Sequence, residues 1–208
     1  KDVYLDLEGM LEAHFEQQGD FTLGGLDYSR MRDEIPLLLD DMLAGTHRIQ
    51  RIVDDLRDFA RQGPADLSET VDLNQVLTTA IRLLDNTIRK STNHFEVNYD
   101  AKLPQFKGNA QRIEQVIINL MVNACQALES VDQGIVINTR YRPQSRLLCL
   151  EIQDHGRGIE PENLTLLSDP FYTTKREQGG TGLGLSISTS IVQEHGGKLV
   201  FESAPGQG

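Results

Sequence analysis

The hydrophobic pattern of this sequence changes near residue 63, and the change predicts two regions with different folds. Before it, apolar residues recur every three or four positions, first over residues 1–19 and then from Ile35 to Phe59, which is the spacing of amphipathic helices. After it, helix-like and strand-like segments alternate. The segment "RQGPADLSETVD" between them has the Gly, Pro and Ser content of a linker. We therefore assign residues 1–62 to helices, 63–70 to a linker and 71–208 to a second domain.

The first region is expected to form an antiparallel helical hairpin. Its first helix covers residues 1–19, and the glycines of "GDFTLGGLD" end it. The second helix is expected to start between Asp33 and Pro36, because acidic residues followed by a proline are common at a first helical turn. Its apolar stripe needs a partner surface, which the first helix covers only in part. We expect a second copy of the chain to cover the rest, giving a homodimer through these helices.

The second domain combines helices with strands. Helical spacing marks residues 73–90, 109–128 with Asn109 as the capping residue, and 184–197 with two glycines at the end. Alternating apolar residues mark strands at 94–100, at 134–154 around a turn at Pro143, and at 198–204. Helices beside a mixed sheet predict an α+β fold, a two-layer α/β sandwich.

The composition excludes several kinds of partner. The net charge is −11 and the pI is near 4.9, whereas a nucleic-acid-binding surface needs a basic footprint and an anionic membrane face repels an acidic protein. The longest apolar runs, "IPLLL" and "VIINLMV", are far shorter than a membrane span. Cys125 and Cys149 form no CxxC pair and predict neither a disulfide nor a zinc site. We expect this region to be cytoplasmic, and leave open whether a longer protein is membrane-anchored.

A stripe of carboxamides runs along the helix expected at 109–128. Gln115, Asn119, Asn123 and Gln126 recur at spacings of four, four and three beside the apolar face. A solvated face more often carries Glu and Lys, because carboxamides compete for backbone hydrogen bonds. An amide oxygen is a hard, neutral ligand that suits Mg²⁺ beside a phosphate. An ordinary polar helix face is the alternative interpretation.

A strand followed by glycines gives a second candidate site. In "LLCLEIQDHGRGIEP", a half-buried strand delivers Asp154 at its end, followed by Gly156 and Gly158. The carboxylate can accept a hydrogen bond from an exocyclic amine such as that of adenine, and the glycines let the backbone approach a flat ring. A turn capped by an aspartate is the alternative.

The third candidate is the segment "DPFYTTKREQGGTGLGLSIS", residues 169–188. It is not a Walker A loop, because no lysine follows its last glycine, and it contains no GxGxxG dinucleotide fingerprint. Instead "GTGLG" runs into a helix start, where free N–H groups and the positive end of the helix dipole bind phosphate. A flexible glycine hinge is the alternative.

The order of these motifs resembles that of a known family. "NLMVNACQA", "DHGRGI", "DPFYTTK" and "GGTGLGLSI" look like the N, G1, F and G2 boxes of the catalytic, ATP-binding domain of bacterial sensor histidine kinases. The resemblance covers residues 68–208 and implies a Bergerat-type ATP-binding fold. Residues 1–62 resemble the rear part of that family's dimerisation and histidine phosphotransfer region, where "GTHRIQRIVDDLRDFAR" is similar to the second helix.

The resemblance implies a role for each matching residue. Asn123 would ligate a Mg²⁺ ion that bridges the ATP phosphates, Asp154 would hold the adenine amine, and Lys175 would reach the terminal phosphate as the catalytic residue. The remaining residues of the implied ATP-binding set frame the adenine, lie in a mobile lid or cradle the phosphates: Asn119, Gln126, Gly156, Gly158, Ile159, Thr173, Thr174, Gly180, Thr181, Gly182, Leu183, Gly184 and Leu185.

Two departures from the family pattern, and one difference from a related class of ATPases, bear on the activity. Gln126 stands where many members carry a lysine, which leaves more of the phosphate charge to Mg²⁺ and Lys175. Asn119 stands where the related gyrase-, HSP90- and MutL-type ATPases carry a water-activating glutamate, which favours a kinase that spares ATP from water. None of the five histidines begins the His–Glu/Asp–x–x–x–Pro box that holds the family's phosphate acceptor. We therefore expect the acceptor upstream of Lys1.

The activity implied by the resemblance is transfer of the ATP γ-phosphate to a histidine, followed by relay to an aspartate on the receiver domain of a response regulator. Positioning and charge neutralisation would supply most of the catalysis. Two alternatives stay open, namely a non-catalytic nucleotide-binding dimer or scaffold and an ATPase of the same fold.

Overall fold

The computed structural model describes residues 2–60, 66–174, 180–206 and 208. The chain divides into two compact units, Lys1–Asp54 and Asp55–Gly208, and each is described below by itself. Among the described residues, no helix is both long enough and apolar enough to cross a membrane.

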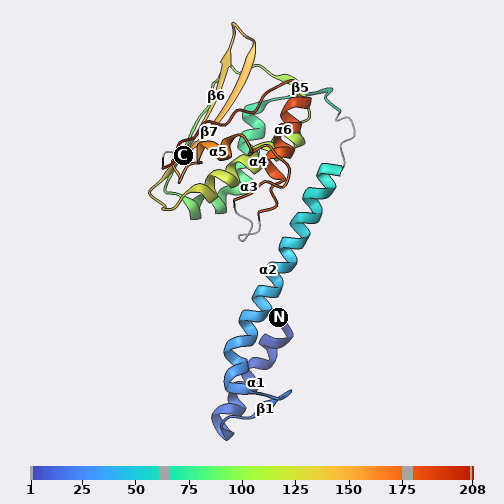
Figure 1. The fold of residues 1–208 in the computed structure, drawn as a ribbon, viewed down its shortest axis with the longest axis vertical. Coiled ribbons are helices and arrows are strands. Elements are labelled where there is room, and N and C mark those ends of the chain that lie inside the picture. The colour runs from blue at the N-terminus through green and yellow to red at the C-terminus, as the bar shows by residue number, and fades with distance from the viewer. Residues whose placement is uncertain (1, 61–65, 175–179, 207) are drawn as a thin grey trace. The chain divides into compact units, whose positions relative to one another are not determined.

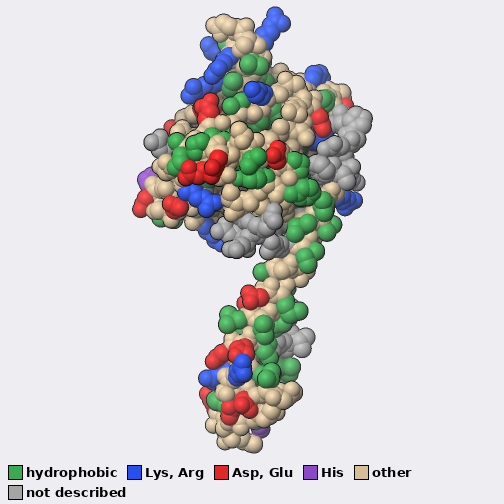
Figure 2. All heavy atoms as spheres, viewed as in Figure 1, with side chains coloured by type: hydrophobic (Ala, Val, Ile, Leu, Met, Phe, Trp, Pro, Cys, Tyr) green, Lys and Arg blue, Asp and Glu red, His purple; other side chains and the backbone are tan. Residues whose placement is uncertain are grey.

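The first unit is built around two helices, as predicted. Helix α1 (Asp2–Gln18) is followed by a short hairpin of β1 (Thr22–Leu23) and β2 (Leu26–Asp27), after which α2 (Tyr28–Ala60) begins (Figure 1). The apolar stripe of α2 is largely exposed to solvent: Leu38 is 57% exposed, Met42 68%, Ile49 64% and Val53 54%. Figure 2 shows hydrophobic side chains along α2. The stripe therefore has the exposed apolar surface that the sequence pattern predicts.

Helix α2 starts earlier than predicted. It begins at Tyr28 rather than near Asp33, and Pro36 lies inside it. The start is held by Asp20, whose carboxylate accepts hydrogen bonds from the Ser29 backbone N–H at 3.0 Å and from the Ser29 hydroxyl at 2.5 Å. Tyr28 is 1% exposed and stacks on Phe21 with ring centroids 4.9 Å apart. A capping group nine residues upstream thus overrides the local signal given by the proline.

Among its described residues, the second unit contains a mixed three-stranded sheet, a separate two-stranded sheet and four helices besides the end of α2. In the three-stranded sheet, β4 (His94–Asn98) runs parallel to β6 (Gly134–Arg142), and β6 pairs antiparallel with β7 (Leu147–Asp154). In the two-stranded sheet, β3 (Glu69–Val71) pairs antiparallel with β5 (Phe106–Gly108). The helices are α3 (Leu73–Ser91), α4 (Ala110–Ala127), α5 (Pro161–Leu164) and α6 (Gly184–Glu194).

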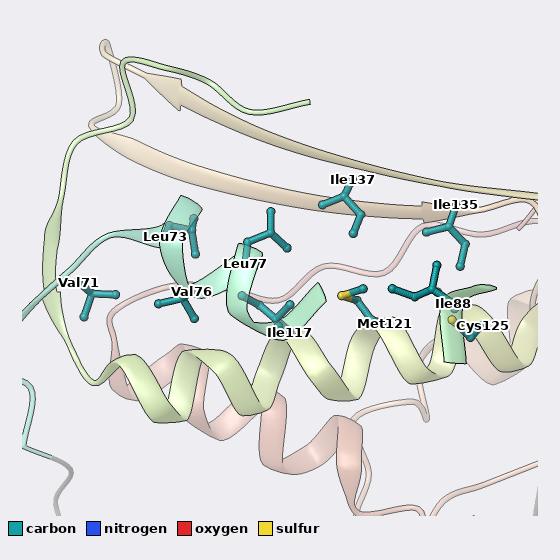
Figure 3. Packing of buried hydrophobic residues seen from close by; sticks show 12 residues of the cluster. Val71, Leu73, Val76, Leu77, Ile88, Ile117, Met121, Cys125, Ile135 and Ile137 are labelled. Carbon is teal, nitrogen blue, oxygen red and sulfur yellow. The ribbon is translucent and has the colours of Figure 1, made fainter. Parts of the chain in front are cut away.

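The main core lies between the three-stranded sheet and helices α3 and α4. Figure 3 shows Ile135 and Ile137 of β6 facing Leu77 of α3 and Ile117 of α4. These four side chains are at most 1% exposed, and each contributes about 1.5–3 kcal/mol when fully buried. A second cluster packs Leu183, at the start of α6, with other apolar side chains of α6 and of α4. The predicted two-layer α/β sandwich is confirmed, with α6 beside α4.

A hydrogen-bonded corner closes one end of the sheet. The Asp100 carboxylate accepts hydrogen bonds from the backbone N–H groups of Lys102 at 2.9 Å and Tyr141 at 3.0 Å. These bonds favour the charged form and lower the pKa of Asp100. The buried Thr139 hydroxyl accepts from the Asp100 N–H at 2.9 Å and donates to the Asn74 side chain at 2.9 Å. The corner therefore joins α3, β6 and the segment after β4.

The strand predicted at residues 198–204 is absent, since the described residues 195–206 contain no strand. The segment bonds instead to the loop that follows β7. The Ser203 hydroxyl accepts a hydrogen bond from the Ile159 N–H at 2.9 Å, and the Gly206 N–H donates to the Arg157 carbonyl at 2.8 Å. These bonds attach the segment to a loop rather than to a strand edge, so the alternating apolar pattern is not expressed as a strand.

Candidate functional site

Helix α4 is the element around which the candidate site is built. Its start is fixed by Asn109, whose side chain accepts a hydrogen bond from the Arg112 N–H at 3.0 Å, as the sequence predicted. Asn119, Asn123 and Ala127 follow one another at spacings of four and therefore lie along one stripe of the helix. The contacts of Asn119 and Ala127 therefore show which elements lie beside Asn123.

Asn119 contacts the first turn of α6. Its side-chain amide lies 3.4 Å from the Gly184 carbonyl oxygen and 3.4 Å from the Ser188 hydroxyl oxygen. A Cβ atom at Gly184 would lie 3.7 Å from the same amide, which is ordinary van der Waals contact. The carboxamide stripe and the glycine-rich segment are therefore neighbours in space, although 65 residues separate the two positions.

Within the described residues, the N-terminus of α6 carries no side-chain cap. Leu183 occupies the N-cap position and makes no capping hydrogen bond with its side chain, so N–H groups of the first turn are left for another acceptor. Gly182 just before it has φ +70°, and its carbonyl accepts a hydrogen bond from the Phe171 N–H at 3.0 Å. A Cβ atom at Gly182 would lie 2.5 Å from the Phe171 carbonyl carbon. The "DPFYTT" segment therefore packs directly against the glycine-rich segment.

The other end of the stripe contacts the loop after β7. The Ala127 carbonyl accepts a hydrogen bond from the Arg157 N–H at 3.1 Å, and a Cβ atom at Gly156 would lie 2.6 Å from the Ala127 carbonyl carbon. Gly158 has φ +69°, and a Cβ atom there would lie 2.9 Å from the Ala204 carbonyl carbon. Both glycines are therefore needed for packing of the loop, a reason that the sequence analysis did not foresee.

Two polar side chains of the site have unused hydrogen-bonding capacity. Asp154 ends β7, and its Oδ1 accepts a hydrogen bond from the Gly156 N–H at 3.0 Å, so the aspartate-capped turn does form. Its Oδ2 has no hydrogen-bond partner within the part of the chain that the structure describes. The half-buried Asn123 side chain likewise has no partner among residues 2–60, 66–174, 180–206 and 208. An amide and a carboxylate oxygen are thus left for a ligand.

The comparisons with known proteins agree with this geometry. Residues 108–208 match the family described as "Histidine kinase-, DNA gyrase B-, and HSP90-like ATPase". The chain carries a histidine kinase-type ATPase domain. The matched region begins just before α4 and contains all the contacts described above, from Asn119 to the loop after β7 and the start of α6.

Relatives of this ATPase domain are sensor proteins. The chain is 35% identical over 196 residues to a sensor protein of Shewanella frigidimarina, covering 94% of this chain and 29% of that protein. It is 35% identical over 168 residues to the sensory histidine kinase/phosphatase NtrB of Vibrio alginolyticus, covering 76% of this chain and 46% of that protein. The chain therefore spans less than half the length of these relatives.

A solved structure supports the same assignment. The catalytic domain of histidine kinase ThkA is 29% identical, with a TM-score of 0.56, and the match covers 66% of this chain and 97% of that one. The predicted resemblance to sensor histidine kinases and the predicted fold class are thereby confirmed.

Within this ATPase domain, most of the predicted site residues lie in three segments: the glycine-rich segment, the loop after β7 and the segment that follows "DPFY". Asn119 meets the glycine-rich segment, which holds the half-buried Gly180, Thr181 and Leu185. A second group is formed by Asp154, the last residue of β7, and by Gly156, Gly158 and Ile159 in the loop that contacts Ala127. Thr173, half-buried, and Thr174, exposed, follow the "DPFY" segment, and Gln126 is exposed on α4. Lys175 lies outside the described residues, so its predicted role stays a prediction.

Sequence reasoning missed the groups that hold the site together. The Ala127 carbonyl and residues 203–206 fix the loop after β7, and His195 fixes the far end of α6 against α4. Nothing in the residue types or spacing at these positions indicates a role in the site. The only signal was the pair of glycines after His195, which indicated a helix end and nothing about its partner.

Proposed function

We propose that this domain binds ATP with Mg²⁺ between the loop after β7 and the N-terminus of α6, and that it serves as the catalytic part of a histidine kinase. The main observation in support of this proposal is the position of Asn123, which lies one helical turn from Asn119 and one helical turn from Ala127. One neighbour contacts the start of α6 and the other contacts the Asp154 loop. A ligand beside Asn123 would therefore reach both elements.

The two ends of the proposed site suit the two ends of the nucleotide. Asp154 Oδ2 can accept a hydrogen bond from the adenine amine, while Gly156 holds the other carboxylate oxygen in place. The uncapped first turn of α6, with the positive end of its helix dipole, suits the phosphates. The Asn123 oxygen is a suitable Mg²⁺ ligand, and the metal would supply neutralisation of the phosphate charge. Lys175 would add a positive charge at the terminal phosphate.

The phosphate acceptor is proposed to be a histidine outside residues 1–208. The His195 ring nitrogens contact Ile191 and Asn109, the His155 ring contacts the Gly134 carbonyl at 3.1 Å, and the His14 ring packs on Phe21. These contacts support structural roles. No histidine of the sequence begins the acceptor box, and the relatives are longer than this chain.

Two partners follow from the proposal. The exposed apolar stripe of α2 suits a second copy of the chain, because burial of such a stripe drives helix association. The phosphate would pass to a response-regulator receiver domain. In support, the structure of histidine kinase ThkA in complex with response regulator protein TrrA, which is 22% identical, matches 82% of this chain with a TM-score of 0.62.

The ATPase alternative is less well supported by the contacts of Asn119. An amide cannot act as a general base for water, and this one already lies against Gly184 and Ser188. The scaffold alternative would need a site that has lost its ligand groups. Asn123 and Asp154 both keep free polar atoms within the described residues, which favours a working nucleotide site.

The proposal is tested by binding and by labelling. Isothermal titration of ATP with Mg²⁺ into residues 1–208 should show binding that Asp154→Ala and Asn123→Ala each weaken by at least about tenfold, the effect of losing one charge-assisted or metal contact. Asn86→Ala, which removes an exposed amide from α3, serves as the matched control and should bind normally. Unchanged binding by both site variants would refute the site assignment.

The transfer step needs a chain extended upstream. Incubation with ATP labelled at the γ-phosphate should give acid-labile, base-stable label, and the label should be lost in both site variants. Rapid release of free phosphate without protein label would support the ATPase alternative. Nucleotide binding without label or release would support the scaffold.

A further inference from the structure

His195 joins the end of α6 to the beginning of α4. Its Nδ1 lies 2.7 Å from the Ile191 carbonyl oxygen, and its Nε2 lies 2.9 Å from the backbone nitrogen of Asn109. A carbonyl oxygen only accepts and a backbone N–H only donates. The proton of the neutral ring must therefore sit on Nδ1, and Nε2 must accept from Asn109.

The surroundings of this ring leave little room for movement. A Cβ atom at Gly108 would lie 2.7 Å from the His195 Cδ2 atom, and the Phe106 ring lies edge-on with its centroid 6.4 Å away. An ion pair between Arg112 of α4 and Glu194 of α6 lies beside it. The junction therefore combines a hydrogen bond, a close packing contact and an ion pair at one place.

The two ends of α6 are held against α4 with different strength. At the start of α6, the Asn119 amide makes only long contacts of 3.4 Å to Gly184 and Ser188, near the limit for a hydrogen bond. At the far end, the His195 bond is 2.9 Å. Between them, apolar side chains of the two helices pack together, and such contacts are not directional. The direction of α6 is therefore fixed mainly by the far end.

We infer that His195 is a positioning residue that aims the N-terminus of α6 at the phosphates of the bound nucleotide. Helix α6 has 11 residues and is ~16 Å long, so a small rotation at its end displaces its first turn. Among the described residues, no hydrogen bond joins the adenine end of the site to α6 itself. Asp154 is held by the Gly156 N–H, and the loop after β7 is held by Ala127 and by residues 203–206. This inference rests on the proposed nucleotide site.

Two substitutions at His195 separate its two hydrogen bonds. In His195→Gln, the side-chain oxygen reaches the place of Nε2 and can still accept from the Asn109 N–H. In His195→Asn, the shorter amide reaches only the place of Nδ1, so it keeps the bond to Ile191 and loses the bond between the helices. The two variants are thus matched in polarity and differ in the link to α4.

The readout is the affinity for ADP with Mg²⁺ compared with that for adenosine, measured by displacement of a fluorescent ATP analogue at a temperature where circular dichroism shows each variant folded. We expect His195→Asn to weaken ADP binding about tenfold, as for the loss of one partly buried hydrogen bond, and to leave adenosine binding within about twofold. His195→Gln should restore ADP binding to within about threefold of the wild type.

A third variant covers the case in which His195→Asn does not fold. Gly108→Ala keeps the imidazole but pushes the new Cβ atom against it, and it should show the same selective loss of ADP affinity. Equal losses for ADP and adenosine, or no loss for either, would overturn the inference. Failure of the wild type to bind ADP would instead overturn the proposed function, and this inference with it.

Discussion

Replacing Gly156 by alanine tests whether the loop after β7 must touch the end of α4. The new Cβ atom would lie 2.6 Å from the Ala127 carbonyl carbon, about 1 Å inside the ordinary contact distance of ~3.5 Å. The atoms of Ala127 that the new Cβ atom meets are backbone atoms, so no side chain can rotate away to relieve this clash. The loop must therefore move off α4.

The expected loss in the free energy of unfolding for Gly156→Ala has two parts. Overpacking of this kind costs about 1–3 kcal/mol. Movement of the loop also breaks the 3.1 Å hydrogen bond from the Arg157 N–H to the Ala127 carbonyl, which is worth about 1 kcal/mol. The sum, about 2–4 kcal/mol, predicts a melting temperature lower by about 5–12 °C for a domain of this size.

Thermal unfolding by circular dichroism and titration with ATP and Mg²⁺ provide the measurements. ATP affinity should fall at least about tenfold, because the Asp154 carboxylate is bonded to the Gly156 N–H at 3.0 Å and moves with the loop. Gly45→Ala in α2 is the matched control, since a Cβ atom there meets nothing within 4 Å. If Gly156→Ala melts and binds ATP as the wild type does, the loop is not held by its contact with Ala127.

Three further outcomes are expected. Asp100→Asn should lower the melting temperature near pH 6, and the difference from the wild type should shrink as the pH falls toward about 3. The reason is that the lowered pKa of Asp100 gives stability that is present above its ordinary pKa and lost when the carboxylate is protonated. A difference that stays constant with pH would contradict this. Light scattering should show that Ile49→Glu, but not Ala44→Glu off the stripe, shifts a dimer to a monomer, and a monomeric wild type would refute the dimer. EDTA should weaken ADP binding by the wild type but not by Asn123→Ala, and equal sensitivity would exclude Asn123 as the metal ligand.

The sequence predicts those elements whose signals are local. Helix α4 begins after Asn109 as expected, because its cap and its apolar spacing both lie within the helix segment. The predicted start of α2 is wrong, because the group that caps this helix, Asp20, lies nine residues upstream of Ser29. A proline that resembles a first-turn residue is tolerated inside the helix, so the local rule misleads.

The contacts of the candidate site are harder to predict, because they depend on which backbone atoms meet. The spacing of Gly156 and Gly158 indicates close approach, but not that the approaching groups are Ala127 and Ala204 rather than a ligand. Likewise, "KLVFESA" has the alternation of a strand, yet the bonds of Ser203 and Gly206 go to the loop after β7. Residue type and spacing thus identify candidate residues and leave their partners undetermined.

Substitutions at the adenine end and at the phosphate end of the nucleotide site should change binding independently, because the two ends are anchored at distant points of the same helix. Ala127 holds the Asp154 loop and Asn109 holds His195, and these anchors are 18 residues apart on α4, or ~27 Å. Gly156→Ala should therefore weaken adenosine and ADP equally, while His195→Asn weakens ADP alone. In the double variant the two losses in ADP binding free energy should add to within about 0.5 kcal/mol. A larger coupling would mean that α4 itself shifts, and that the adenine and phosphate ends are not separately positioned.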